Sequence, residues 1–123
     1  VCSSDLVYPS NTFPNHYSMI TGNYPQKSGI VNNSFYDPDM REGYKIGHKS
    51  MENPKFYNGK PFWHVVEDNG LKSASYFWLA SDIPVNGQLP SYYRKFNKTT
   101  PDQKIFDQAI KWFEIVDVSK RPN

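Results

Sequence analysis

The chain has 123 residues and a formal net charge of +2, with acidic and basic side chains interspersed along its length. This pattern gives no basic stripe, so we expect no nucleic acid as a structural partner. The sequence has no run of 18 apolar residues, and we therefore expect no membrane-spanning segment within it.

The first predicted element is a helix that ends at Gly22. Pro14 suits the first turn of a helix, and Gly22 suits the left-handed position just past its end. Thr12 therefore lies at or just before the N-terminus, where backbone N–H groups and the helix dipole favour a bound anion. A hydroxyl on that turn faces any phosphate captured there. The alternative reading from spacing alone is that Thr12 is an ordinary N-cap.

The next predicted elements alternate between loop, helix and strand. Residues 34–59 are rich in Gly, Pro, Asn and Asp and predict a loop or short hairpin covering the site. Residues 60–70 predict a short helix, with Phe62, Val65, Val66 and Asn69 on adjoining faces. Residues 71–78 are small or aromatic without an internal breaker, and they predict a strand.

The last predicted element is a helix that begins with a capping box. Thr100 and Gln103 have the capping-box spacing, with Pro101 at the first helical position. Apolar side chains then recur at helical spacing, at Ile105, Ala109, Trp112, Phe113 and Val116. The predicted helix over residues 60–70 followed by the predicted strand over residues 71–78 indicates an α/β fold.

The strongest signal in the sequence is a series of short segments in a definite order. Around the first helix they are Thr12-Phe-Pro-Asn-His-Tyr17, Thr21-Gly-Asn-Tyr-Pro25, Gly29-Ile-Val-Asn-Asn33 and Phe35-Tyr-Asp-Pro38. Further along they are Lys60-Pro-Phe-Trp63, Gly70-Leu-Lys-Ser-Ala74, Phe77-Trp-Leu-Ala-Ser-Asp82 and Pro90-Ser-Tyr-Tyr-Arg-Lys-Phe-Asn97. Together they resemble the nucleotide pyrophosphatase/phosphodiesterase family (type I phosphodiesterases) of the alkaline phosphatase superfamily.

The resemblance carries expectations about fold and domain organisation. It implies an α/β fold in which the chain supplies part of an alkaline-phosphatase-like parallel sheet flanked by helices, incomplete here. The active site is then expected beyond the carboxyl ends of the strands. Residues 1–6 match the family poorly and are interpreted as a candidate non-native end. Residues 7–123 are interpreted as the N-terminal part of the catalytic domain, a fragment of a longer enzyme.

Two sequence patterns bear on the source, and the resemblance bears on the location. Two glycosylation sequons, at Asn32 and Asn97, adjoin expected site residues, where a glycan would obstruct the cleft. We read them as chance matches, which favours a bacterial source. The family resemblance implies a periplasmic or secreted enzyme.

The implied chemistry is zinc-dependent hydrolysis of a phosphodiester or pyrophosphate bond in a nucleotide, releasing a nucleoside 5'-monophosphate. Thr12 would be both the nucleophile and a metal ligand, and the reaction would pass through a covalent nucleotidyl-threonine. A threonine hydroxyl needs activation, which a divalent metal supplies. Asn33 would donate its amide to a phosphate oxygen together with the backbone N–H of Phe13. Two zinc ions are expected, with their remaining ligands outside this chain.

The implied substrate is a small nucleotide held by aromatic rings. Phe13 and Phe96 match positions that sandwich the base, and Trp78 and Asp82 match further pocket positions, Asp82 reaching the base amino group. Leu79 replaces a usual proline, which leaves the preferred base open. The alternative for Phe96 and Trp78 is core packing, because aromatic residues make up 16% of the chain and most aromatic side chains are buried.

The three histidines do not predict a metal site, because no two lie at a metal-binding spacing. His16 is expected to pack within its helix, His48 to lie on a surface loop and His64 on a helix face.

Two other functions stay open. A phosphodiesterase for lipid or choline headgroups would share Thr12 and Asn33 but would replace the base-stacking rings. A non-catalytic binding module for sugars or peptides would need its aromatic rings on an open surface and Thr12 capped and buried.

Overall fold

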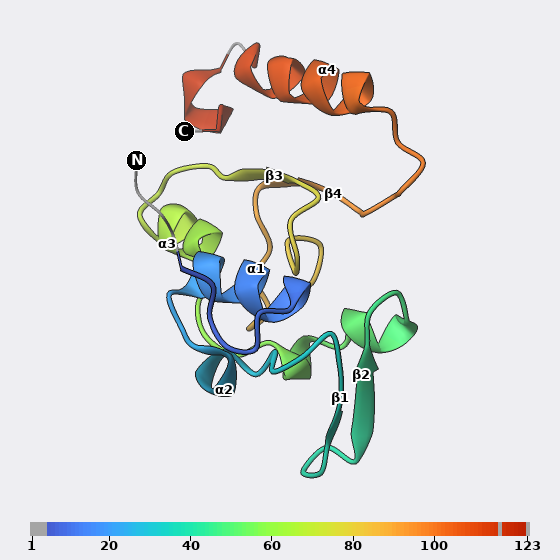
Figure 1. Ribbon diagram of the computed structural model, residues 1–123. Helices are drawn as coiled ribbons and strands as arrows, with labels where there is room; N and C mark the ends of the chain where they lie inside the picture. The colour runs from blue at the N-terminus through green and yellow to red at the C-terminus, as the bar shows by residue number, and fades with distance from the viewer. Residues whose placement is uncertain (1–4, 116, 123) are drawn as a thin grey trace. The chain divides into compact units, whose positions relative to one another are not determined.

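The computed structural model describes residues 5–115 and 117–122, and the chain divides into two compact units, Val1–Pro61 and Phe62–Asn123 (Figure 1). Each unit combines helices with a small sheet, which confirms a mixed α/β fold. One two-stranded sheet is antiparallel and the other is parallel. The larger parallel sheet implied by the resemblance stays a prediction. Residues 1–4 of the expected non-native end lie outside the described residues.

The first unit begins with the predicted helix. Helix α1 spans Thr12–Thr21, and the short helix α2 spans Pro25–Ser28. Gly22 ends α1 in the left-handed conformation, with φ of 65°, and its N–H donates to the Ser18 carbonyl at 2.8 Å. This confirms the predicted helix and its glycine end.

A hairpin and two 3-10 turns follow in the segment predicted to be loop or hairpin. Strands β1 (Ser34–Asp37) and β2 (Glu42–Lys45) pair antiparallel, which confirms the short hairpin (Figure 1). The carboxylate of Asp37 accepts from the backbone N–H groups of Asp39 and Met40, both at 2.9 Å, and so shapes the turn. Two 3-10 helices come next, Lys49–Glu52 and Pro54–Phe56.

The core of the first unit is aromatic. The Tyr44 ring stacks on Phe35 with centroids 5.0 Å apart and meets Phe56 edge to face at 5.2 Å. The Tyr44 and Tyr57 hydroxyls share a buried hydrogen bond of 3.0 Å, and Tyr57 also packs against Tyr17 of α1. Burial raises the pKa of Tyr44 to about 12, although the hydrogen bond to Tyr57 acts in the opposite direction. The rings therefore fix α1 against the hairpin.

The second unit contains α3 (Phe62–Asp68), the parallel strands β3 (Ala74–Tyr76) and β4 (Tyr92–Arg94), α4 (Asp102–Phe113) and a 3-10 turn (Val118–Lys120). The helix predicted over residues 60–70 forms. The strand predicted over residues 71–78 is confirmed only at its centre. It stops before Phe77, because that residue has a φ of 67° and no longer has extended backbone.

Helix α3 buries the side chains of Trp63 and His64, whereas Phe62 and Val65 are exposed. His64 Nε2 lies 3.0 Å from the backbone carbonyl of Gln88, which satisfies a polar ring that would otherwise be costly to bury.

The last predicted helix forms, but its capping box does not. Helix α4 begins at Asp102, and its N-cap is Pro101, which has extended backbone and no side-chain capping bond. The capping-box prediction at Thr100 is therefore wrong, because Pro101 lies outside the helix instead of at its first position. Trp112 is buried, as its place in the apolar pattern predicts, while Phe113 is exposed. The predicted apolar position Val116 lies outside the described residues.

Candidate active site

Thr12 is the first residue of α1, and its side chain is exposed. The N-cap is Asn11, which makes no capping bond, so the alternative that Thr12 is an ordinary N-cap is wrong. The first turn carries no acidic residue. The positive end of the helix dipole is thus unopposed, and an anion at this terminus would meet no carboxylate from that turn.

Asn33 is hydrogen-bonded to Phe13, the residue that follows Thr12. The backbone N–H of Phe13 donates to Asn33 Oδ1 at 2.9 Å. With its oxygen held in this way, Asn33 keeps Nδ2 as its donor group. The structure differs from the expectation in one respect, since the Phe13 N–H is not an open donor but is used to orient Asn33.

A pair of asparagines, Asn11 and Asn32, also fastens this loop to the start of the helix. Asn11 Nδ2 donates to Asn32 Oδ1 at 2.8 Å, and that oxygen also accepts from the backbone N–H of Asn33. The loop can follow this path because Gly29 has a φ of 86° and a Cβ there would collide with the Phe56 carbonyl oxygen. Ile30 is completely buried and anchors the loop to the core.

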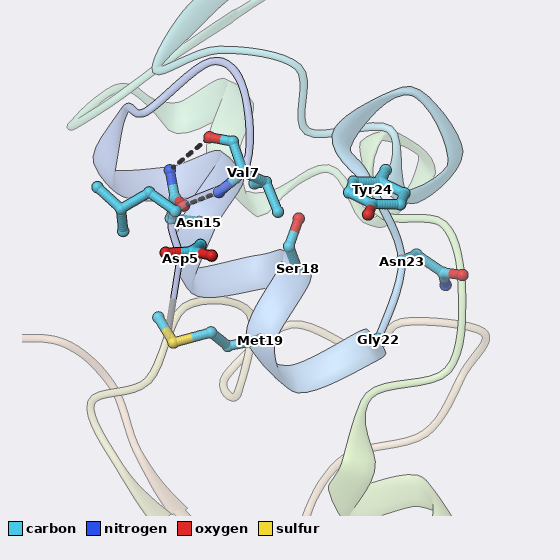
Figure 2. A pocket seen from close by; sticks show the side chains of 9 residues that line it. Asp5, Val7, Asn15, Ser18, Met19, Gly22, Asn23 and Tyr24 are labelled. Atoms are coloured by element: carbon cyan, nitrogen blue, oxygen red, sulfur yellow. Dashed lines mark hydrogen bonds between the residues drawn. The ribbon is translucent and has the colours of Figure 1, made fainter. Parts of the chain in front are cut away.

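Asn15 holds the chain that leads into Thr12, a role that sequence reasoning missed. Its Oδ1 accepts from the Val7 N–H at 2.8 Å, and its Nδ2 donates to the carbonyls of Pro9 and Asn11 at 3.2 and 2.8 Å. Figure 2 shows this side chain turned toward Val7. The only signal in the sequence was the position of Asn15 inside the segment Thr12–Tyr17. The backbone before α1 is therefore fixed by a buried amide.

The pocket in Figure 2 has a volume of about 310 Å³ and is lined by Asn15 and Ser18 of α1 and by Gly22 just past its end. None of the predicted site residues lines it. Thr12 lies instead at the exposed N-terminus of α1, where Asn33 is hydrogen-bonded to the backbone N–H of Phe13.

The histidines serve structural roles in the described geometry. His16 Nδ1 donates to the Thr12 carbonyl within α1 at 2.7 Å. His48 is exposed and accepts from the Ser50 N–H, which caps a 3-10 turn. Among residues 5–115 and 117–122, no three His, Cys, Asp or Glu side chains gather as a metal site would require. Thr12 is thus the one expected metal ligand within this part of the chain.

In the second unit, the predicted substrate residues follow β3 and β4. Phe96 is 71% exposed, with its ring edge to face against Phe77 at 5.4 Å. The Phe96 ring is therefore not part of the buried core of the second unit. Trp78 is 37% exposed, and its carbonyl accepts from the N–H and hydroxyl of Ser81, which forms the tight turn before the half-buried Asp82.

Glu67, at the end of α3, is a second residue that the sequence reasoning missed. Its carboxylate accepts from the backbone N–H and the hydroxyl of both Ser73 and Ser91, at 2.7 to 2.9 Å. Burial alone would raise the pKa of Glu67, but these hydrogen bonds outweigh it and lower the pKa below the ordinary 4.5. Because Ser91 is 24 residues away, no local pattern predicted this cluster.

Comparison with known proteins places these features in a family. A model of type I phosphodiesterase/nucleotide pyrophosphatase matches residues 4–123. The chain is 39% identical over 109 residues to human ectonucleotide pyrophosphatase/phosphodiesterase family member 1, covering 89% of this chain and 12% of that protein. It is 38% identical to a venom phosphodiesterase of Macrovipera lebetinus, covering 89% of this chain and 13% of the relative.

Solved structures agree with this assignment. Inactive murine ectonucleotide pyrophosphatase/phosphodiesterase 5, a threonine-to-alanine variant in complex with AMP, superposes with a TM-score of 0.86 at 26% identity. The match covers 91% of this chain and 30% of that one. The human counterpart gives a TM-score of 0.87 at 25% identity, and the match covers 95% of this chain and 30% of that one. Within the described residues, no helix is long and apolar enough to cross a membrane. The matched segments, the α/β units and these likenesses together show that the chain belongs to the type I phosphodiesterase/nucleotide pyrophosphatase family.

Proposed function

We propose that this chain supplies the nucleophile and part of the substrate site of an enzyme that hydrolyses phosphodiester or pyrophosphate bonds of nucleotides. The chain spans about an eighth of the length of the curated relatives it matches, so the whole activity is proposed for a longer protein. The chain would then form the N-terminal part of a catalytic domain built on a larger parallel sheet.

One observation carries the proposal: an exposed threonine begins a helix that has no acidic first turn, and an oriented amide stands next to it. The helix N-terminus attracts the phosphate, Thr12 presents its hydroxyl to it, and Asn33 Nδ2 donates to an oxygen on which negative charge builds. The alternative of a binding module required Thr12 to be capped and buried, and neither condition is met.

The proposed reaction proceeds in two displacements at phosphorus. Thr12 Oγ1 forms a bond to phosphorus while the bond to the leaving group breaks, which produces a nucleotidyl-threonine, and the leaving group departs with the hydroxyl proton. Water then attacks the same phosphorus, the bond to Thr12 breaks, and a nucleoside 5'-monophosphate leaves. The inactivity of the murine threonine-to-alanine relative supports a threonine-dependent reaction.

Two zinc ions are proposed as the cofactor, in a family that is typically metal-dependent. The described residues do not fit such a centre by themselves, because Thr12 offers one oxygen and a zinc site needs about four ligands. A bound metal would make the threonine hydroxyl a better nucleophile. We therefore expect the isolated 123-residue chain to show no Thr12-dependent turnover with added zinc.

Nucleotides are the proposed substrates because each unit offers a ring of the expected kind. Phe13 leans edge to face on buried Tyr44 at 6.4 Å, and Phe96 is an exposed ring supported by Phe77. Stacking needs only a ring face, which either phenylalanine can supply. Trp78 and Asp82 are proposed as further base contacts. The AMP complex of the murine relative supports this substrate class.

The proposed location is periplasmic or extracellular, because the similar proteins are named as ectoenzymes and venom enzymes.

The test uses the full-length protein and a nitrophenyl ester of a nucleoside 5'-monophosphate. We expect turnover that Thr12→Ala abolishes, and rapid acid quenching should yield a Thr12 peptide carrying the nucleotidyl mass. A choline ester serves as the competing substrate. Faster cleavage of that ester, or a modified residue other than Thr12, would contradict the proposal.

A further inference from the structure

The four hydrogen bonds to Glu67 tie together two segments that are far apart in the sequence. Ser73 directly precedes β3, and Ser91 directly precedes β4. Each serine donates both its backbone N–H and its hydroxyl to the carboxylate. The Glu67 side chain is only 12% exposed, with Lys72 Nζ 3.8 Å from its Oε2. A charged acceptor with four donors is a strong local constraint.

The two serines occupy equivalent positions in the sheet. Strand β3 pairs with β4 in parallel, with Ala74 opposite Tyr92. The same offset places Ser73 opposite Ser91. Glu67 therefore binds the two residues just before the N-terminal, or lower, end of the paired strands. In the other direction the pairing ends at Tyr76 and Arg94, and Trp78 and Phe96 each come two residues later. The left-handed backbone at Phe77 ends the shared register there, so the paired strands set where the segments that lead to these two residues begin.

A ladder this short does not hold its register well unaided. It comprises three residue pairs, and a slip would carry side chains to new positions. At the C-terminal end of the strands, the Phe77 ring contacts the exposed Phe96 ring, and Trp112 of α4 packs against both Tyr76 and Tyr92. The lower end is held by the hydrogen bonds to Glu67.

We propose that Glu67 is a positioning residue: by binding Ser73 and Ser91 it sets β3 against β4, and so sets the placement of Trp78 and Phe96 for the nucleotide base. The second part of this proposal, the placement of Trp78 and Phe96 for a base, rests on the proposed function. Glu67 itself touches neither the base nor the phosphate in this account, so its loss should affect binding of the base more than the chemical step.

The test compares Glu67→Ala and Glu67→Gln in the full-length protein, with Glu114→Ala as a control at an exposed glutamate that caps α4. For the nitrophenyl ester of a nucleoside 5'-monophosphate, Glu67→Ala should raise KM about tenfold and leave kcat nearly unchanged. A rise of this size corresponds to losing part of the binding free energy of one base stack. Methyl nitrophenyl phosphate, which has the same leaving group and no base, should show no change in KM. Glu67→Gln should lie between, because its amide can still accept and can donate to the Ser91 hydroxyl.

Hydrogen–deuterium exchange supplies a readout that is independent of substrate. Amides of β3 and β4 should exchange faster in Glu67→Ala and not in Glu114→Ala. If Glu67→Ala does not fold, Ser91→Ala removes one hydroxyl donor and should show a smaller change in the same direction. Unchanged exchange, or an equal rise in KM for both substrates, would overturn the proposal. If the wild-type protein does not cleave the nucleotide ester, the proposed function fails, and the exchange result alone decides the role of Glu67 in the sheet.

Discussion

The start of α1 in the first unit and the ends of β3 and β4 in the second hold their functional side chains in opposite ways. Around Thr12, asparagine side chains fasten the backbone: Asn15 holds the incoming chain, and Asn33 is bound to Phe13. Beyond the strands, Phe96 has an exposed ring that meets the Phe77 ring edge to face. Chemistry at phosphorus needs atoms fixed in advance, whereas stacking needs an open ring face. This contrast fits the proposal that the first region carries catalysis and that the second contributes, with Phe13, to recognition of the base.

Replacing the nucleophile should have the largest effect. In the full-length protein, Thr12→Ala should lower kcat by more than about 1000-fold, because no covalent step can occur without the hydroxyl. Thr12→Ser should retain more activity than Thr12→Ala. Steady-state hydrolysis of the nucleotide ester measures both variants, with Thr99→Ala as an exposed control. Equal activity of Thr12→Ala and the control would contradict the proposal that Thr12 is the nucleophile.

Removing the oriented amide should have the next largest effect. Asn33→Ala should lower kcat on the order of 100-fold with little change in KM, because its donor matters most as charge builds on phosphate. Asn32 is the matched control, since it braces the same loop through Asn11. Asn32→Ala should lower kcat clearly less than Asn33→Ala does. A near-normal kcat for Asn33→Ala would contradict the role as phosphate donor and would leave Asn33 only a role in holding the loop.

Loss of the exposed ring should separate binding from chemistry. Phe96→Ala should weaken kcat/KM for the nucleotide ester by about 1 to 3 kcal/mol, the value of a lost stack. Phe96→Tyr keeps the ring and should be tolerated. Phe106→Ala removes an equally exposed phenylalanine from α4 and should have no effect. A Phe96→Ala protein with unchanged nucleotide kinetics would contradict a stacking role.

The Glu67 carboxylate should produce the smallest effect, a pH dependence of stability. Because folding lowers its pKa below 4.5, its ionised form stabilises the folded state above that value. This contribution is lost as the pH falls through the folded-state pKa. The difference in melting midpoint between wild type and Glu67→Gln, recorded from pH 7 down to pH 3, should therefore shrink at the acid end. A constant difference would show that the charge is not what the serines bind.

The sequence predicted what local patterns determine. Pro14 and Gly22 marked α1, and both its start and its glycine end are confirmed. The strand over residues 71–78 was predicted too long, because aromatic composition does not reveal the left-handed backbone at Phe77. The Thr100 capping box failed because the helix starts one residue later than the spacing suggested.

The candidate site was predicted as a set of residues, without the bonds that hold them. The motifs identified Thr12 and Asn33, but not that Asn33 is oriented by the Phe13 N–H. The Glu67 cluster was missed because it joins a helix end to two serines brought together only by strand pairing. Long-range hydrogen bonds of this kind leave no periodic signal.

The most direct test of this division between catalysis and recognition is a comparison of two substrates that share one leaving group. The kcat/KM of the nitrophenyl nucleotide ester is divided by that of methyl nitrophenyl phosphate, for wild type, Asn33→Ala and Phe96→Ala. Asn33→Ala should lower both substrates together and leave the ratio unchanged, while Phe96→Ala should lower the ratio about 5- to 150-fold. An unchanged ratio in a folded Phe96→Ala protein, or a ratio that falls in Asn33→Ala, would contradict the account.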